Sequence, residues 1–208
     1  MPIKNNREYR AMPLMGSAIG KEKRLKSDYY VEGYATTFND PYVLFEENGI
    51  QYKEVIDRNA LVGADMSDII MQYDHCGDVL ARKSNGTLIV ETDDKGIFIA
   101  ADMGKSAAAR RRYEEIQNGL IHQMSWAFTV AEDAYDRETH TRTILRIKKV
   151  YDVSAVSIPA NPSTDIAARS YFDGEIEKEK QELLEREAHE RQIRKIKLLM
   201  EVENFDKT

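Results

Sequence analysis

One serine in this chain stands where a hydroxyl could act as a nucleophile. Ser125 lies within the strand-like run 120–128, which contains two aromatic residues and follows Gly119, a residue suited to ending a helix. A serine hydroxyl attacks a carbonyl carbon only when a neighbouring base removes its proton, and histidine is the usual base near neutral pH. A strand serine alone is therefore weak evidence for catalysis, and the rest of the chain has to supply its partners.

The alternation of this run gives its two faces side chains of different size. A two-residue period places Ser125 and Ala127 on one face, and Trp126 and Phe128 on the other. We therefore expect Trp126 and Phe128 to anchor the strand in the core, while Ser125 faces a cleft. His122 is the nearest histidine in sequence, but its opposite parity makes it a poor base for Ser125.

His75 is the best candidate for the base among the four histidines. It follows a buried strand predicted over 67–73, and Gly77 comes close behind it, so its imidazole would be presented at a strand end. His140 lies in a polar connection and His189 in a charged segment, where we expect both to be solvated. A histidine with a purely structural role is the competing interpretation of His75.

Asp152 is the most suggestive carboxylate for orienting that histidine. It interrupts the apolar run Val150–Val156, where strand packing alone would not select an acid. A buried charge at this position needs a partner, and a third group that orients the histidine is what such chemistry requires. A solvent-facing position on the strand is the competing interpretation.

The crowded polar residues at 74–78 suggest a second type of chemistry. Asp74, His75, Cys76 and Asp78 are of metal-ligand types, so a metal-dependent hydrolase is an alternative. Adjacent residues on an extended chain diverge, however, and no second histidine cluster completes a ligand shell. The sequence also lacks a glycine-rich phosphate loop, an HExxH motif, paired CxxC motifs and a dinucleotide-binding fingerprint. We therefore expect neither a metal nor a cofactor.

The composition is that of an ordinary globular chain of 208 residues. A formal net charge of −6 argues against a general nucleic-acid-binding protein, and the single cysteine excludes an internal disulfide framework. No apolar run approaches transmembrane length, and the start of the chain has no signal-peptide core. We expect no nucleic acid and no membrane as partners, and a location in the cytoplasm.

The elements that position the candidate residues are predicted to be mainly strands. The segment 105–118 is rich in alanine and predicts a helix, and Asp57 could cap a brief helix over 57–61. A polar hairpin connection is expected over 133–139. This pattern predicts an α+β fold organised as a compact β-rich barrel or sandwich. Alternation and turn residues predict the other strands over 28–38, 51–56, 67–73, 79–82, 87–92, 97–103 and 143–158.

Three regions are expected along the chain. Residues 1–27 lack sustained periodicity and predict an irregular arm, with room for a first strand at its end. Residues 28–172 form the main domain. Residues 173–208 are rich in Glu, Lys, Arg and Leu and predict a charged helical tail with an imperfect apolar stripe. A solvated tail and a docking or oligomerising helix both fit this pattern.

Several segments, taken in order, resemble the prohead proteases of tailed DNA phages, which are serine proteases of capsid maturation with a fold similar to herpesvirus assemblin. The similarity extends from Tyr30 to Arg169, and the joint order of the segments is specific although each is short. They are Val31–Ala35, Tyr73–His75 after a buried strand, Asp94–Ile97, Gln123–Phe128 after a helix and a glycine, and Asp152–Pro162.

The resemblance implies roles for particular residues within an assemblin-like barrel. His75 would be the general base, Ser125 the nucleophile and Asp152 the acidic third member, although the family more often has glutamate at that last position. The backbone N–H groups of Ala160 or Asn161 are candidates for stabilising an oxyanion, because the prolines around them take the chain out of the strand ladder.

The implied function is that of a serine endopeptidase without a cofactor. Its substrates would be the scaffold protein, the removable segment of the major capsid protein, and the protease itself, inside the immature capsid (the prohead) in the host cytoplasm. The charged tail would recruit the enzyme into the prohead or be cleaved off on maturation, and a homodimer is compatible with the resemblance. The alternative is a non-catalytic capsid-assembly module that uses the same barrel and docks through the tail.

Overall fold

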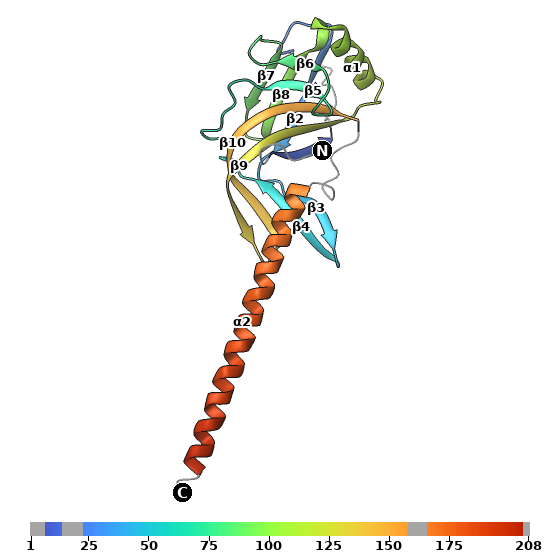
Figure 1. Ribbon diagram of the computed structural model, residues 1–208. Coiled ribbons are helices and arrows are strands. Elements are labelled where there is room, and N and C mark those ends of the chain that lie inside the picture. Colours follow the sequence, from blue (N-terminus) through green and yellow to red (C-terminus); the bar gives the residue numbers. More distant parts are fainter. Residues whose placement is uncertain (1–6, 14–22, 158–165, 206–208) are drawn as a thin grey trace. The chain divides into compact units, whose positions relative to one another are not determined.

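The computed structural model describes residues 7–13, 23–157 and 166–205. The chain divides into two compact units, residues 1–168 and residues 169–208. The first is built mainly from strands and the second is helical (Figure 1), so the predicted α+β class is confirmed. The strands are β1 Glu8–Pro13, β2 Tyr30–Thr37, β3 Tyr42–Glu47, β4 Ile50–Ile56, β5 Ile70–Tyr73, β6 Val79–Arg82, β7 Leu88–Thr92, β8 Gly96–Asp102, β9 Gln123–Asp136 and β10 Thr141–Val156. The helices are the 3-10 helix η1 Met103–Lys105 and the α-helices α1 Ala107–Gln117 and α2 Ile166–Phe205.

The strands pair into two sheets. The larger sheet has the order β1-β9-β10-β4-β3, and β5 also pairs with β10 and carries β6 at its side; the smaller sheet has the order β2-β8-β7. The long antiparallel pair of β9 and β10 forms the centre of the larger sheet. Pairing between the described strands does not close these sheets into a barrel, so the predicted barrel is not confirmed. Alternation in a sequence indicates which residues form strands, but it does not specify which strand edges meet.

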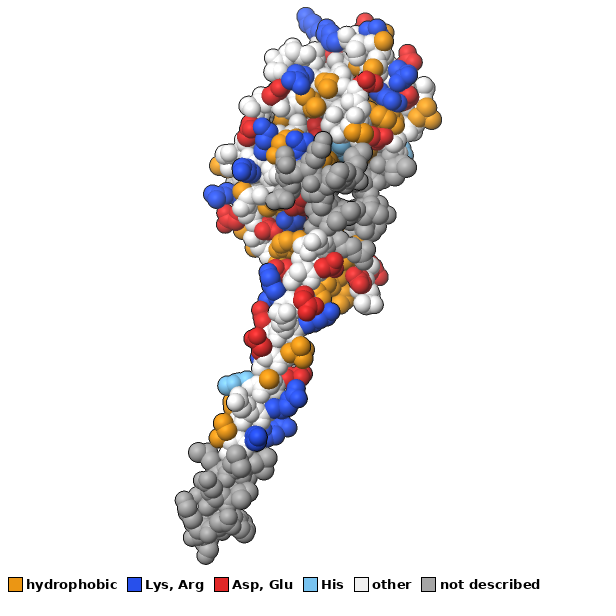
Figure 2. Space-filling model, viewed as in Figure 1, with side chains coloured by type: hydrophobic (Ala, Val, Ile, Leu, Met, Phe, Trp, Pro, Cys, Tyr) orange, Lys and Arg blue, Asp and Glu red, His pale blue; other side chains and the backbone are white. Residues whose placement is uncertain are grey.

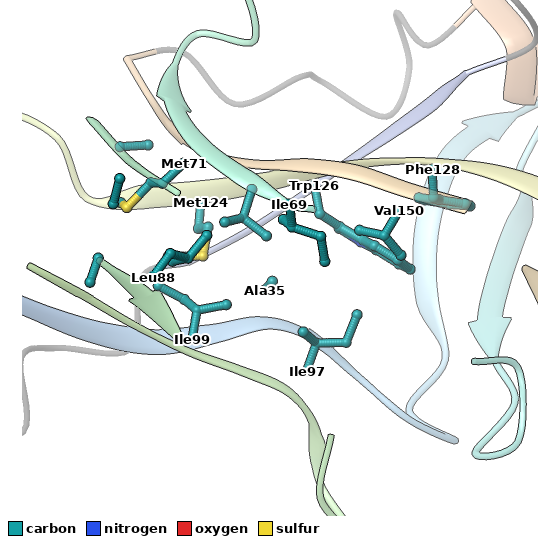
Figure 3. Close-up of a cluster of buried hydrophobic side chains, with 14 of the residues drawn as sticks. Ala35, Ile69, Met71, Leu88, Ile97, Ile99, Met124, Trp126, Phe128 and Val150 are labelled. Atoms are coloured by element: carbon teal, nitrogen blue, oxygen red, sulfur yellow. The ribbon is translucent and has the colours of Figure 1, made fainter. Parts of the chain in front are cut away.

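The hydrophobic core lies between the two sheets. Met124 and Trp126 of β9 and Ile97 and Ile99 of β8 are fully buried members of one cluster (Figure 3). The rings of Trp126 and Phe128 stack at a centroid distance of 4.1 Å. Burying an aromatic side chain of this size contributes about 1.5–3 kcal/mol to stability. The prediction that Trp126 and Phe128 anchor β9 in the core is therefore confirmed.

Helix α1 begins and ends at signals that are visible in the sequence. The Ser106 hydroxyl accepts a hydrogen bond from the Ala109 N–H at 3.0 Å and caps the first turn. Gly119 has a φ of +72°, in the left-handed region that favours glycine after a helix. Both the predicted helix and its glycine stop are therefore confirmed.

The helix predicted over 57–61 is wrong. Asp57 does cap the segment, since its Oδ1 accepts a hydrogen bond from the Asn59 N–H at 2.7 Å. Residues 58–63, however, form successive turns, and Gly63 has a φ of +79°. An aspartate that bonds to the backbone two residues ahead favours a turn as readily as a helix start.

Two strands lie where no strand was predicted, and one strand is longer than expected. The irregular arm predicted over 1–27 contains β1, which is held by pairing with β9 far along the chain. Strand β3 forms a hairpin with β4 through Asn48 and Gly49, whose φ values of +52° and +79° are those of a tight hairpin turn. The connection expected over 133–139 is shorter, because β9 continues to Asp136.

The second unit, from residue 169 onward, is built on the long helix α2. The helix starts at Ile166, before the predicted tail at residue 173, and it continues through Gly174. One glycine inside a helix costs about 1 kcal/mol, which a helix of this length tolerates. Both acidic and basic side chains cover it (Figure 2), and Leu183, Leu184, Ile193 and Ile196 are exposed. No helix within the described residues is both long enough and apolar enough to cross a membrane.

Candidate active site

Ser125 lies in the middle of the larger sheet, between two small residues. Its register partners are Ala11 on β1 and Ser154 on β10, and partners in antiparallel strands share a face of the sheet. This face is opposite to the one from which Trp126 enters the core, as the alternation predicts. Ser125 is fully buried, however, so the cleft that we expected beside it is not confirmed.

His75 lies between Ser125 and Asp152 and is within hydrogen-bonding distance of both. The distance from Nε2 to the Ser125 Oγ is 2.7 Å, and the distance from Nδ1 to the Asp152 Oδ1 is 2.6 Å. Because a carboxylate only accepts hydrogen bonds, we assign the ring proton to Nδ1, and Nε2 then accepts a hydrogen bond from the Ser125 hydroxyl. The three residues singled out from the sequence therefore meet in one hydrogen-bonded chain, and only 11% of the His75 side chain is exposed.

The pairing of β5 with β10 brings His75 to this place. The two strands run parallel, with Tyr73 at the end of β5 beside Ala155 of β10. The chain therefore leaves β5 next to the strand that carries Asp152. The prediction that His75 follows a strand end is confirmed, since β5 ends at Tyr73.

The turn after β5 has an unusual backbone. Asp74 and His75 have φ values of +48° and +57°, in the left-handed backbone region that residues other than glycine rarely occupy. The Asp74 carboxylate accepts hydrogen bonds from the Ser157 N–H at 2.9 Å and from the Ser157 hydroxyl at 2.8 Å. The Asp74 N–H also donates to the Ala155 carbonyl at 3.1 Å. These bonds tie the turn to the end of β10 and offset a strain of about 1–3 kcal/mol per residue.

A serine missed in the sequence supports the carboxylate. The Ser154 hydroxyl donates a hydrogen bond to the Asp152 Oδ1 at 2.8 Å, and both side chains are buried. Asp152 therefore has a donor from its own strand as well as the His75 imidazole, which satisfies a charge that burial alone would destabilise. The two-residue spacing, which puts both side chains on one face, was the signal that could have found Ser154.

Among the other candidate residues, Ala160 and Asn161 lie outside the described residues. None of the other three histidines, all of which are described, joins this chain of hydrogen bonds. His122 is exposed and precedes β9, in keeping with its rejection as the base, and His189 is exposed on α2. His140, which we expected to be solvated, is half-buried, and its Nδ1 lies 2.9 Å from the Tyr135 hydroxyl.

The polar residues at 74–78 point in different directions. Asp74 bonds to Ser157, His75 faces the sheet, and Cys76 is exposed. Within the ranges that the structure describes, there is no group of three or more His, Cys, Asp or Glu side chains that could hold a metal ion. A cavity of about 690 Å³ lies over the smaller sheet, and its lining does not include His75 or Ser125. The hydrogen-bonded chain is therefore a better guide to function than the cavity.

Comparison with known proteins agrees with this geometry. A family model described as caudovirus prohead serine protease matches residues 19–179. This chain belongs to the caudovirus prohead serine protease family. The resemblance noted in the sequence is thus confirmed, and the region matched to the family contains His75, Ser125 and Asp152.

One relative is the prohead protease of Enterobacteria phage HK97. It is 28% identical over 145 residues, which cover 69% of this chain. The same alignment covers 61% of the relative, so this member of the family spans about three fifths of that protein's length. No solved structure matches the chain significantly.

Proposed function

We propose that this protein is a serine endopeptidase that acts in phage prohead maturation, with Ser125 as nucleophile, His75 as general base and Asp152 as the orienting acid. The observation that carries the proposal is the hydrogen-bonded chain from Asp152 through His75 to Ser125. Membership of the prohead serine protease family supports the same reading. All three residues lie in the proposed protease domain, residues 28–172, and the reaction needs no cofactor.

The proposed reaction proceeds in two steps through an acyl-enzyme. In the first, the Ser125 Oγ bonds to the carbonyl carbon of a peptide while His75 Nε2 takes the hydroxyl proton. The C–N bond then breaks, and the departing amine receives that proton from Nε2. In the second step water attacks the ester carbon and His75 again takes and returns one proton. The peptide acid leaves, and the Ser125 hydroxyl is restored.

Asp152 and the neighbouring serine support the imidazole during both steps. The carboxylate keeps the proton on Nδ1, so that Nε2 is free to accept, and it stabilises the imidazolium that forms. The Ser154 hydroxyl holds the carboxylate in place. Our proposed donors to the oxyanion are the backbone N–H groups of Ala160 or Asn161; this proposal rests on the sequence alone, since the prolines at 159 and 162 cannot donate to a strand ladder.

The proposed substrates are inferred from the family and not from the hydrogen-bonded chain of Asp152, His75 and Ser125. They are the scaffold protein, the major capsid protein and the protease's own chain, inside the prohead in the host cytoplasm. A homodimer is compatible with this function.

The test is to follow cleavage by the wild-type chain and by Ser125→Ala and His75→Ala. The proteins are incubated with scaffold and capsid proteins, and the products are identified by mass spectrometry. We expect both variants to lose cleavage, including self-cleavage. Ser84→Ala and His122→Ala are the matched controls, because both residues are exposed and lie outside the hydrogen-bonded chain. Unchanged products from both site variants would eliminate the proposed mechanism.

Two alternative functions predict different results when the cleavage experiment is extended by an assay of entry into proheads and by a chelator. A non-catalytic assembly module would enter proheads normally, yet the wild-type chain would cleave neither protein. A metal-dependent hydrolase would lose activity with a chelator but keep it in Ser125→Ala.

A further inference from the structure

Strand β1 brings an aromatic side chain to the proposed base. The ring of Tyr9 lies 4.6 Å from the His75 ring between centroids, with an angle of 69° between their planes. This is an edge-to-face contact, a favoured arrangement for aromatic rings. Strand β1 ends at Pro13, and the region matched to the family begins at residue 19. The contact therefore comes from a part of the chain outside the matched region.

We propose that Tyr9 is a positioning residue for His75, an inference that rests on the proposed protease function. In the register of the sheet, Tyr9 is the partner of Ala127, and Ala127 is the partner of Asp152. These three side chains form a row across β1, β9 and β10 on the face that carries Ser125. His75 bonds to Asp152 at one end of the row and touches the Tyr9 ring at the other.

The two hydrogen bonds alone would leave the imidazole less constrained than it is with the Tyr9 ring beside it. The bonds to Asp152 and Ser125 direct the two ring nitrogens, but the ring can still tilt about the line that joins them. The Tyr9 ring meets the imidazole from the side opposite Asp152 and limits this tilt. Ala127, between them in the row, is small enough to leave room for the imidazole.

Buried charges hold β1 in the register that this contact requires. Glu8 and Arg10 flank Tyr9 and have the opposite parity, so they point to the other face of the sheet. The Arg10 Nε donates to the Glu54 Oε1 at 2.6 Å, and an Arg142 N–H donates to the Glu8 Oε2 at 2.8 Å. All four charged side chains are at most 10% exposed.

This network makes Tyr9 a fixed part of the site. Removing one partner from a buried ion pair leaves an uncompensated charge, which strongly destabilises the fold. A slip of β1 by one residue would break the pairs and also turn the Tyr9 side chain to the other face. The network therefore opposes such a slip of β1 and keeps the Tyr9 ring against His75.

The test compares Tyr9→Ala with Tyr9→Phe, which keeps the ring. We expect Tyr9→Ala to lower kcat for peptide cleavage by about 5- to 10-fold with KM nearly unchanged, the size expected for one aromatic contact. Tyr9→Phe should stay within about 2-fold of wild type, because its ring makes the same contact. Tyr34→Ala is the matched control, since it removes a ring that makes a similar edge contact with Phe98 in the smaller sheet. All variants are assayed at a temperature where thermal unfolding shows them to be folded.

Two results would overturn the proposal: a kcat for Tyr9→Ala equal to that of wild type, or a loss in Tyr9→Phe as large as in Tyr9→Ala. If Tyr9→Ala does not fold, Tyr9→Leu takes its place, since leucine fills the position without a ring.

Should the wild-type chain show no turnover that depends on Ser125, the proposed protease function fails. The Tyr9 contact is then judged by NMR: the His75 ring C–H resonances should shift in Tyr9→Ala while those of His122 stay, and an unmoved His75 signal contradicts the contact.

Discussion

Asp152 reaches the imidazole although its side chain is one carbon shorter than that of glutamate, the other acidic residue. The pairing of β10 with β9 shifts register between Val150 and Asp152, directly before the acid. A bulge of this kind re-aims the side chains that follow it. Together with the Ser154 hydroxyl, it supports the 2.6 Å contact between Asp152 and His75.

Replacing Asp152 with asparagine should weaken cleavage less than replacing Ser125, the proposed nucleophile. The amide keeps the shape of the side chain but favours the wrong imidazole tautomer, so we expect kcat to fall on the order of 10⁴-fold. Ser125→Ala should lower kcat by about 10⁶-fold, because no other group forms the covalent bond. Hydrolysis of a peptide substrate measures both, and Asp68→Asn at an exposed ion pair is the control. Equal and complete losses would indicate a stricter role for Asp152.

Ala127 should be sensitive to size because it lies between Tyr9 and Asp152 in the row. In Ala127→Val, two added methyl groups would occupy space that the His75 imidazole needs. We expect overpacking of about 1–3 kcal/mol, with an additional loss of kcat even where the protein is folded. Thermal unfolding and peptide hydrolysis separate these effects. Ala100→Val, at a buried position of β8, is the control: activity lost equally in both variants at equal folded fraction would refute this prediction.

Strand β1 depends on charges that are paired within the sheet. Burial alone would raise the pKa of the Glu8 carboxyl, but Arg10 and Arg142 outweigh burial and hold that pKa below its ordinary value. Burial likewise opposes the charged form of Arg10, yet Glu54 raises the pKa of the guanidinium well above its ordinary value. The lowered pKa of Glu8 and the raised pKa of Arg10 both favour the charged forms of these residues in the folded state, so β1 is most firmly held near neutral pH.

This pairing predicts how stability depends on pH. A carboxyl whose pKa is lowered by folding stabilises the protein above its unfolded pKa, about 4.3, and this contribution is lost as the pH falls through the folded value. The free energy of unfolding of Glu8→Gln should therefore lie well below that of wild type at pH 7, and the difference should shrink below pH 4.3. Urea denaturation across this pH range measures it. A difference that stays constant with pH would contradict the prediction, and Glu132→Gln, at an exposed ion pair with Arg146, should show little change.

At the scale of the whole molecule, the two units differ in how they use their side chains. The first unit, residues 1–168, buries a shared core between two sheets. The second exposes charged residues and several large apolar ones along α2. A helix that is polar on most sides has little to gain from folding against its own chain, which favours a role in contacts with other molecules. We propose that the tail, residues 173–208, recruits the enzyme into the prohead.

Deletion of residues 174–208 should separate recruitment from chemistry. We expect the shortened chain to hydrolyse a peptide substrate at a rate within a few-fold of wild type, because His75, Ser125 and Asp152 all lie in the first unit. Its amount in purified proheads, measured by quantitative mass spectrometry, should fall. Normal packaging of the shortened chain would refute the recruitment role, whereas loss of peptide hydrolysis would show that the tail is needed for the catalytic unit.

Much of this protein is determined by local patterns in the sequence. The cap and stop of α1, the alternating faces of β9 and the turn after β7 each depend on residues a few positions apart, whose preferences act within one element. The same patterns separated Ser125 from the core-facing Trp126, excluded His122 as the base and singled out His75 and Asp152. The order of the short segments then predicted the family.

Only the tertiary structure decided which elements meet. Strand β1 pairs with residues of β9 that lie more than 100 positions away, and its buried charges reach Glu54 and Arg142 on two other strands; no local pattern specifies such partners. The left-handed turn at Asp74 and His75 is likewise held by Ser157, which directly follows the distant strand β10. A strand's side chains acquire their neighbours only when its edges pair. For this reason the sequence identified the three candidate residues, and the fold alone brought His75 within hydrogen-bonding distance of the other two.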